Sequence, residues 1–237
     1  MAIFHHRIKS GRNARNHARY IERRGQFSSA HGDAIHIGQG NLPAWANGDW
    51  TLFWTTAEKH ERRNGAVYRE HVIALPNELT HHQLIELAER LALVLPGNKP
   101  YQYAIHVSEG KLSGVLNPHM HLMYSDRVQD GIDRPPAQMF SRFNPKHPEL
   151  GGCRKDSGGK TPLELRDEVL RTRKTIAEIQ NHALATHGHD ARIDHRSLRE
   201  QGRLRRPERH LGPAVVRGMG GDEKALYNTM RRASSGG

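Results

Sequence analysis

Two histidine-bearing segments between Tyr101 and Arg127 constrain the fold of this chain more than any other part of its sequence. The alternation of apolar and polar residues there predicts two β-strands joined by a loop rich in Gly and Ser. His119 and His121 stand two positions apart on the second strand, so both imidazoles project from the same side of a sheet. An antiparallel partner strand would bring His106 against them. The sequence therefore predicts a sheet that carries three imidazoles on one face.

Three neutral imidazoles on a rigid sheet are typical of a cation site that leaves coordination positions open for a substrate. A His-x-His pair alone has a simpler interpretation, in which His119 and His121 are polar residues on the solvated face of a half-buried strand. The third strand-borne histidine, His106, favours the metal site. Ligand preference alone would suit zinc or copper there.

The charge of the chain points to a polyanionic partner. Among 237 residues the formal net charge is +11, the pI is about 10.1 and only 35% of residues are hydrophobic. This excess favours nucleic acid over a membrane surface, because no long amphipathic Lys-rich helix is present. Cys153 is the only cysteine, which excludes an intrachain disulfide. No segment resembles a signal peptide or a transmembrane span, so we expect no membrane insertion and a cytoplasmic location.

A helix is predicted from Ala14 to Arg24, and Gly25 ends it. The open question on this helix is which way Tyr20 faces. Its neighbours three and four positions away are polar or cationic: Asn16, His17, Arg23 and Arg24. We therefore expect Tyr20 on a cationic surface, where positive charge would favour the phenolate and attract phosphate. The alternative is an ordinary surface tyrosine whose ring packs on arginine side chains.

The remaining pattern predicts an α+β fold. Strands are expected at Ala2–Ile8 and Val67–Leu75, with a turn through Gly11 and irregular structure at Gln26–Gly48. Helices are expected at Asp49–Gly65, Thr80–Leu95 and Thr161–Gly188, the second of them opening on a capping box formed by Thr80 and Gln83. A long polar segment occupies Asp126–Lys160, and a short strand is predicted at Arg192–Asp194. The last stretch suits a mobile tail or a helix at Lys224–Arg232.

Separate blocks of the chain resemble the MobA/MobL-type (MOBQ) conjugative relaxases. The tyrosine segment of that family resembles the amino-terminal MAIFHHRIKSGRNARNHARYIERRGQF. The sheet that carries its histidine triad is similar to HVIALPNELT, YAIHV and NPHMHLMYSDR. Its later segments are similar to GIDRPPAQMFSRFNPKHPELGG and to GHDARIDHRSL with HLGP. The resemblance spans Met1–Val216, and the blocks follow one another in the family's order.

The resemblance implies an HUH (histidine–hydrophobe–histidine) nuclease fold, which is an α+β fold with a central antiparallel sheet flanked by helices. It implies a relaxase domain over residues 1–216, followed at 217–237 by a flexible basic tail or the start of a linker. The implied reaction is site-specific cleavage and rejoining of single-stranded plasmid DNA at an origin of transfer, through a 5′-phosphotyrosyl intermediate. The implied working ion is Mn²⁺ or Mg²⁺, with Zn²⁺ as the alternative.

Residue by residue, the resemblance matches Tyr20 with the nucleophile and Glu70 with an acidic residue on the strand that feeds the site. The matched metal ligands are His106, His119 and His121. The family often has a second acid two residues after the first, where this chain has Val72. Activation of Tyr20 could come from the metal, the arginines or Glu70 as a base. The cations expected to contact DNA are Arg15, Arg19, Arg23, Arg24, Arg127, Arg134, Arg142 and Lys146.

The partners implied by the resemblance are single-stranded DNA at the origin of transfer, accessory mobilisation proteins and the coupling protein of a type IV secretion system. Such a protein would be delivered to a recipient cell with its DNA. Three other functions stay open from the sequence. One is a rolling-circle replication initiator with the same chemistry. The others are a histidine-triad metallohydrolase, in which water attacks, and a non-catalytic single-stranded DNA-binding module.

Overall fold

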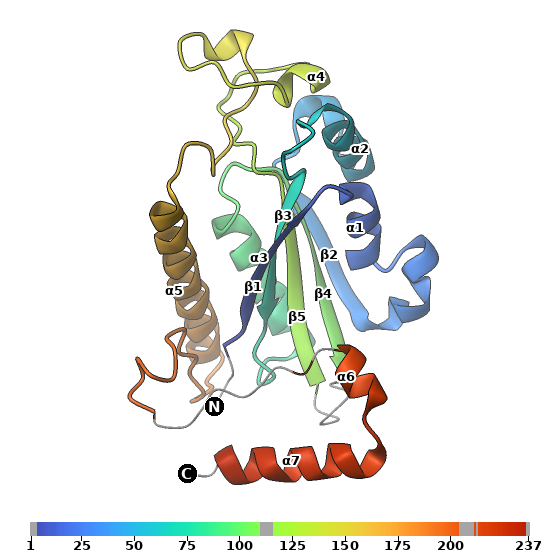
Figure 1. Ribbon diagram of the computed structural model, residues 1–237, viewed down its shortest axis with the longest axis vertical. Coiled ribbons are helices and arrows are strands. Elements are labelled where there is room, and N and C mark those ends of the chain that lie inside the picture. Colours follow the sequence, from blue (N-terminus) through green and yellow to red (C-terminus); the bar gives the residue numbers. More distant parts are fainter. Residues whose placement is uncertain (1–3, 110–115, 204–210, 212, 236–237) are drawn as a thin grey trace.

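The chain forms one antiparallel sheet in the order β1-β3-β5-β4-β2 (Figure 1). The computed structural model describes residues 4–109, 116–203, 211 and 213–235. The strands are β1 (His6–Gly11), β2 (Ala34–Gly40), β3 (Tyr68–Ala74), β4 (Tyr101–Glu109) and β5 (Leu116–Tyr124). The helices are α1 (Ala14–Ile21), α2 (Trp50–His60), α3 (His81–Val94), α4 (Pro136–Met139), α5 (Pro162–Thr186), α6 (Pro213–Gly218) and α7 (Gly221–Ser235). Short 3-10 helices are η1 (Gly25–Asp33), η2 (Ala44–Ala46) and η3 (Pro148–Leu150).

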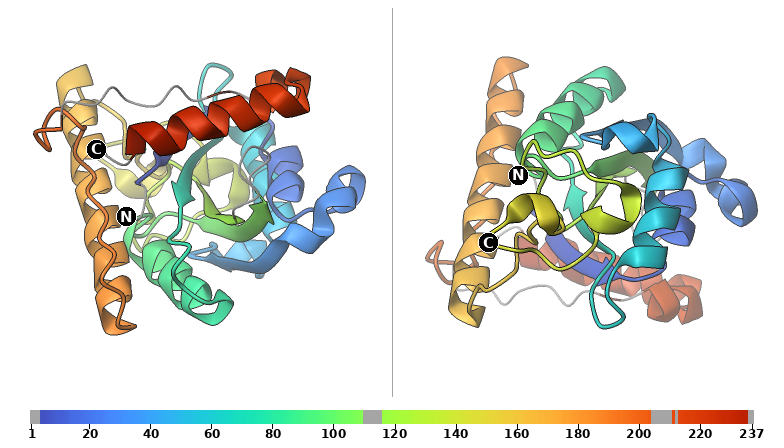
Figure 2. Two further views of the ribbon diagram at one scale, coloured as in Figure 1. Left: turned by 90° about the horizontal axis from the view of Figure 1, so that it is seen from below. Right: turned by 90° about the horizontal axis from the view of Figure 1, so that it is seen from above.

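Helices cover both faces of the sheet, so the predicted α+β fold with a central antiparallel sheet and flanking helices is confirmed. Helices α3 and α5 lie on one face, and α1 and α2 lie on the other (Figure 2). The layer under α3 and α5 is apolar, and its fully buried members include Leu91, Ile105, Met120, Leu122 and Ile176. The layer under α1 and α2 buries Ala14, Ala18, Ile21, Phe53 and Trp54.

Local hydrogen bonds start the helices where the sequence predicts them. Thr80 accepts a bond from the Gln83 backbone N–H and the Gln83 side chain accepts one from the Thr80 N–H, which completes the capping box of α3. Thr161 and Glu164 make the same reciprocal pair at α5. At α2, the Asp49 carboxylate accepts from two backbone N–H groups of the first turn. All three helices are confirmed, although α2 ends at His60 and not at Gly65.

The prediction of irregular structure at Gln26–Gly48 is wrong, because this segment contains the edge strand β2. Gly38 pairs with Tyr103, and Gly40 pairs with Tyr101. A Cβ atom on Gly38 would lie 2.4 Å from the Tyr103 ring, and one on Gly40 would lie 2.5 Å from the Tyr101 ring. The glycines therefore leave room for aromatic rings that cross the strand, and they do not break it.

Two further predictions are wrong. Gly11 is not part of a turn but the last residue of β1, where it pairs with Tyr68 and lies under the ring of that residue. Arg192–Asp194 does not form a strand. Instead, the Asn181 side chain of α5 accepts from the Ile193 N–H at 2.7 Å and donates to the Ile193 carbonyl at 2.8 Å. These two bonds satisfy the backbone N–H and carbonyl of Ile193, which in a strand would pair with a neighbouring strand.

The carboxy-terminal part that the structure describes is helical. Helix α7 contains the helix predicted at Lys224–Arg232 and is longer than that prediction. Among the described helices, none combines the length and the apolar character that crossing a bilayer requires.

A buried histidine pair joins β1 to β3. His6 Nε2 lies 2.9 Å from His71 Nδ1, and the His71 ring stacks on Tyr124 with 5.0 Å between ring centroids. Burial lowers the pKa of His6 to about 4 and the pKa of His71 to about 3. Both rings are therefore neutral in the folded protein at pH 7.

This pair should make the fold sensitive to acid. Its pKa values are depressed below the unfolded value of about 6.5, so below that pH the unfolded chain takes up protons that the folded chain does not, and stability falls. Above pH 6.5 the pair adds no pH dependence. Replacing either histidine should remove its contribution to the slope of the free energy of unfolding against pH. We predict that in the double variant His6→Gln/His71→Gln this slope is smaller than in the wild type by up to about 1.4 kcal/mol per pH unit for each histidine replaced.

Urea unfolding between pH 7.5 and pH 4.5 measures the slope. The variant His82→Gln, in which an exposed side chain is replaced, is the matched control and should keep the wild-type slope. Equal slopes for the wild type and the double variant would contradict the assignment of the acid sensitivity to this pair.

Candidate active site

The three predicted histidines lie together on the face of the sheet that α1 covers. His106 on β4 pairs directly with His119 on β5, and His121 is two residues further along the same strand. The ring centroids are 5.3 Å apart for His106 and His119, 4.8 Å for His106 and His121, and 5.1 Å for His119 and His121. One nitrogen from each ring lies within 4.8 Å of the others, which is close enough for a shared cation.

Hydrogen bonds set which nitrogen of each ring carries the proton. His121 Nδ1 lies 2.6 Å from Glu70 Oε1, and an ionised carboxylate can only accept, so this nitrogen donates. His119 Nδ1 lies 2.9 Å from the carbonyl oxygen of Asn117 and donates to it. In both rings the lone pair is therefore on Nε2, the nitrogen that is left to bind a metal.

His106 has the opposite tautomer. Its Nδ1 lies 3.1 Å from Nη2 of Arg23, and a guanidinium can only donate, so Nδ1 is the acceptor. Its Nε2 lies 2.6 Å from the carbonyl oxygen of Ile21 and donates to it. The lone pair of His106 is therefore on Nδ1, and in this structure it is engaged by Arg23.

The protonation states suit a metal site. Burial lowers the pKa of His106 to about 3 and that of His119 to about 4, and it also lowers the pKa of His121. Burial alone would raise the pKa of Glu70, but its contacts with His121 and His17 hold that pKa well below its usual range. Three neutral imidazoles, one of them oriented by a buried carboxylate, form a donor set that fits a divalent first-row cation.

Helix α1 places Tyr20 against this cluster. The Tyr20 ring meets the His121 ring edge-on at 6.1 Å, stacks with His17 at 5.7 Å and is flanked by Phe27 at 5.4 Å. The guanidinium carbon of Arg23 lies 4.9 Å from the centre of the same ring. Tyr20 is thus half-buried beside the histidines with a cation above it. The expected cationic environment is present, but the ring is not on an open surface.

Glu70 has two further partners that the sequence did not assign to the site. His17 Nε2 is 3.0 Å from Glu70 Oε1, and Lys9 Nζ is 3.4 Å from Oε2. The His17 ring also stacks on Tyr68 at 4.7 Å, so His17 lies between the two tyrosines of this face. One sequence feature could have placed His17 in the site. It stands three residues before Tyr20 on a helix, and such residues share a helix face.

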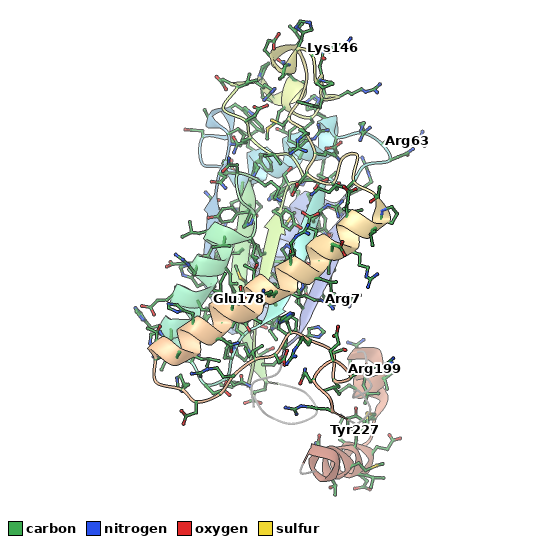
Figure 3. All side chains as sticks on the ribbon, turned by 90° about the vertical axis from the view of Figure 1, so that its left-hand side faces the viewer. Arg7, Arg63, Lys146, Glu178, Arg199 and Tyr227 are labelled. Atoms are coloured by element: carbon green, nitrogen blue, oxygen red, sulfur yellow. The ribbon has the colours of Figure 1, made fainter. Side chains whose placement is uncertain are left out.

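The predicted DNA-contacting cations divide into two groups. The exposed ones are Arg15, Arg19, Arg24, Arg142 and Lys146. The first three are on or just after α1, the helix that carries Tyr20. Lys146 lies at the end of the molecule where β4 begins, whereas His106 lies toward the opposite end of that strand (Figure 3). The buried ones are Arg23, Arg127 and Arg134.

Arg127 and Arg134 are buried and hydrogen-bond to backbone carbonyls of the long polar segment. Arg127 makes two bonds of 3.0 Å to Glu61, and Arg134 makes bonds of 2.6 Å and 2.8 Å to Asp130. Their remaining N–H groups donate to backbone carbonyls, which belong to Pro148 and Gly151 for Arg134 and to Phe140, Ser141 and Cys153 for Arg127. Donors used in this way are not available to phosphates, so we revise their predicted role to a structural one.

Comparisons with known proteins find similarity along most of this chain. The model of the MobA/MobL family matches residues 6–219. "Mobilization protein A" of Escherichia coli is 42% identical over 91% of this chain, and the "43 kDa relaxation protein" of Salmonella typhimurium is 39% identical over 85% of it. The chain spans 30% and 56% of the lengths of these two relatives.

A solved structure supports the fold separately. It is described as "Molecular Basis of Vancomycin Resistance Transfer in Staphylococcus aureus", and it superposes with a TM-score of 0.61 over 83% of this chain and 100% of its own. The sequence identity is 22%, so this similarity concerns the fold alone.

The burial of Arg127 predicts a loss of stability when it is replaced. Arg127→Met should lower the free energy of unfolding by roughly 3 kcal/mol, because it leaves the buried Glu61 without its main partner. Arg142→Met removes an exposed arginine from the same segment and should change stability by less than about 0.5 kcal/mol. Urea unfolding measures both. If Arg127→Met instead keeps wild-type stability and weakens binding of single-stranded DNA, Arg127 is a DNA contact after all.

Proposed function

Because this chain belongs to the MobA/MobL family, we propose that it is the relaxase part of a plasmid mobilisation protein. It cleaves one DNA strand at an origin of transfer and later rejoins it. The observation that carries this proposal is the placement of Tyr20 against His121, within a cluster of three neutral histidines. A solvent-exposed tyrosine and scattered histidines would not support it.

Tyr20 is the proposed nucleophile. Its phenolic oxygen attacks the scissile phosphorus and loses its proton, the bond from phosphorus to the 3′-oxygen breaks, and that oxygen takes up a proton. A 5′-phosphotyrosyl link remains, which keeps the free energy of the phosphodiester available for rejoining. Arg23 and the exposed arginines near α1 place positive charge around the reacting phosphate.

Glu70 acts on His121 in this proposal and not on Tyr20. Its low pKa and its contacts with His121, His17 and Lys9 make it a poor proton acceptor, so the possibility that it is the general base loses support. It instead fixes the tautomer of His121 and raises the basicity of the ligand nitrogen. No second acid stands on β3, where Val72 occupies the position opposite His121.

His106, His119 and His121 would hold a divalent cation. Such an ion, bound to a non-bridging phosphate oxygen, would neutralise charge that repels the nucleophile. The family resemblance favours Mn²⁺ or Mg²⁺, while three imidazole ligands would also suit Zn²⁺.

The proposed partner is single-stranded plasmid DNA at the origin of transfer. The net charge of +11 supports a polyanionic ligand, and Arg15, Arg19 and Arg24 are exposed on or just after the helix that carries Tyr20. Among the relatives is "Conjugal transfer protein TraA" of Agrobacterium fabrum, at 31% identity over 68% of this chain. We extend the proposal to accessory mobilisation proteins and a type IV coupling protein as partners, and to action in the cytoplasm.

Replacement of Tyr20 by Phe tests the proposal. The change removes one oxygen and almost no volume, so folding and DNA binding should persist while cleavage falls on the order of 10³-fold or more. Tyr68→Phe is the matched control, because Tyr68 is the other tyrosine that stacks on His17. The assay uses labelled single-stranded oligonucleotides tiled across the DNA flanking the protein's own gene, with Mn²⁺, and a denaturing gel for the covalent adduct.

The outcomes separate the possible functions. Loss of both cleavage and adduct in Tyr20→Phe alone supports the relaxase. Cleavage that continues without an adduct would make water the nucleophile and the protein a metallohydrolase. Wild-type binding with no cleavage of any oligonucleotide would favour the non-catalytic binding module.

A further inference from the structure

Arg23 contacts Asp33, Tyr20 and His106 at the histidine cluster. Its Nε and Nη2 bond both oxygens of Asp33, at 2.9 Å and 3.2 Å, and its Nη1 lies 3.4 Å from the carbonyl oxygen of Tyr20. The same Nη2 donates to His106 Nδ1 at 3.1 Å. Its backbone has φ of 57°, a left-handed conformation that is uncommon for a residue with a side chain. The surrounding contacts therefore hold Arg23 in place against an unfavourable backbone.

The bond to His106 has a consequence for any bound metal. His106 has one ring lone pair, on Nδ1, because its Nε2 carries the proton that is donated to Ile21. A lone pair cannot accept a hydrogen bond and coordinate an ion at the same time. The other two histidines are different, because their Nδ1 atoms are the donors and their Nε2 lone pairs are not engaged by the guanidinium. A cation that binds His106 through Nδ1, together with the other two rings, would therefore displace Arg23 from His106.

The charges around Arg23 make such a displacement feasible. Asp33 holds the guanidinium through two bonds, and only one N–H of Nη2 needs to leave His106. The pKa of Asp33 is lowered, although burial opposes this, because Arg23 stabilises its carboxylate. Asp33 is therefore an anion that can keep Arg23 within the site after the bond to His106 is broken.

We propose that Arg23 is a resident cation of the histidine cluster that competes with the divalent metal for His106. In the metal-free protein it keeps His106 and Tyr20 assembled, through its contacts with the ring of one and the carbonyl and ring of the other. When a divalent cation binds, the Nη2 group gives up His106 and stays tied to Asp33. The inference rests on the metal site of the proposed function and adds a positioning residue to it.

Nuclear magnetic resonance of the wild-type protein during a Zn²⁺ titration tests the competition directly. Zn²⁺ is the probe because it is diamagnetic and suits imidazole ligands. Before metal is added, His106 should show the Nε2–H tautomer, while His119 and His121 show the Nδ1–H tautomer. During the titration the ring nitrogens of all three histidines and the guanidinium signals of Arg23 should shift with one midpoint.

Two results would overturn the proposal while leaving the metal site intact. In one, His119 and His121 shift while His106 and Arg23 do not. In the other, all three histidines shift while the guanidinium signals stay unchanged. If no histidine responds to Zn²⁺, the metal site fails together with the proposal. The wild-type measurement remains decisive even if a variant of Arg23 does not fold.

Metal affinity gives an independent test. Arg23→Gln removes the competing donor and should tighten Zn²⁺ binding by roughly tenfold or more, as measured by competition with a chelating dye. Arg24→Gln removes the same charge one residue further on, from an exposed side chain, and should change the affinity by less than about twofold. A purely structural role for Arg23 predicts the opposite sign, with weaker metal binding in Arg23→Gln because the site is disordered.

Discussion

The bond from His121 Nδ1 to Glu70 is the interaction on which the rest of the site depends. Glu70 is fully buried, so its charge is tolerable only with partners, and these come from three other elements. His121 belongs to β5, His17 to α1 and Lys9 to β1. The Glu70 carboxylate on β3 thereby links the two neighbouring strands, β1 and β5, and helix α1, which carries Tyr20. The same contacts fix the tautomer of His121, so the stability of this region and the chemistry of the site share one group.

The two faces of the sheet differ in role, because one holds the larger apolar cluster and the other holds the three histidines. Strand alternation sends the tyrosines of β4 and β5 to the face under α3 and α5, where they join the larger apolar cluster. The same alternation sends the three histidines to the face under α1, where burial keeps them neutral. Helix α1 closes that face with Ala14, Ala18 and Ile21 and carries Tyr20 on its adjoining side. Arg23 follows at the end of the helix, which places a cation between Tyr20, the proposed nucleophile, and His106, a proposed metal ligand.

Rules that act between near neighbours allowed part of this arrangement to be predicted from the sequence. Strand alternation was sufficient to group the histidines, and cap chemistry was sufficient to start the helix at Thr80. The remaining features depend on residues distant in the chain. The glycines of β2 are required because tyrosine rings of β4 lie against them. The burial of Arg127 depends on its pairing with Glu61, 66 positions away. The pairing of Arg23 with Asp33 depends on the path of η1, which no periodic pattern reveals.

The placement of Tyr20 beside the proposed cation site of the three histidines can be tested directly, through a paramagnetic effect that depends on distance from the bound ion. Fluorotyrosine can be incorporated at all six tyrosines, and single Tyr→Phe replacements assign the resonances. Binding of Mn²⁺ accelerates the relaxation of each fluorine according to its distance from the ion. We expect the largest acceleration per bound Mn²⁺ for Tyr20, a smaller one for Tyr68, and weaker effects for Tyr101 and Tyr124 across the sheet. An acceleration for Tyr20 no greater than that for Tyr101 would contradict this placement.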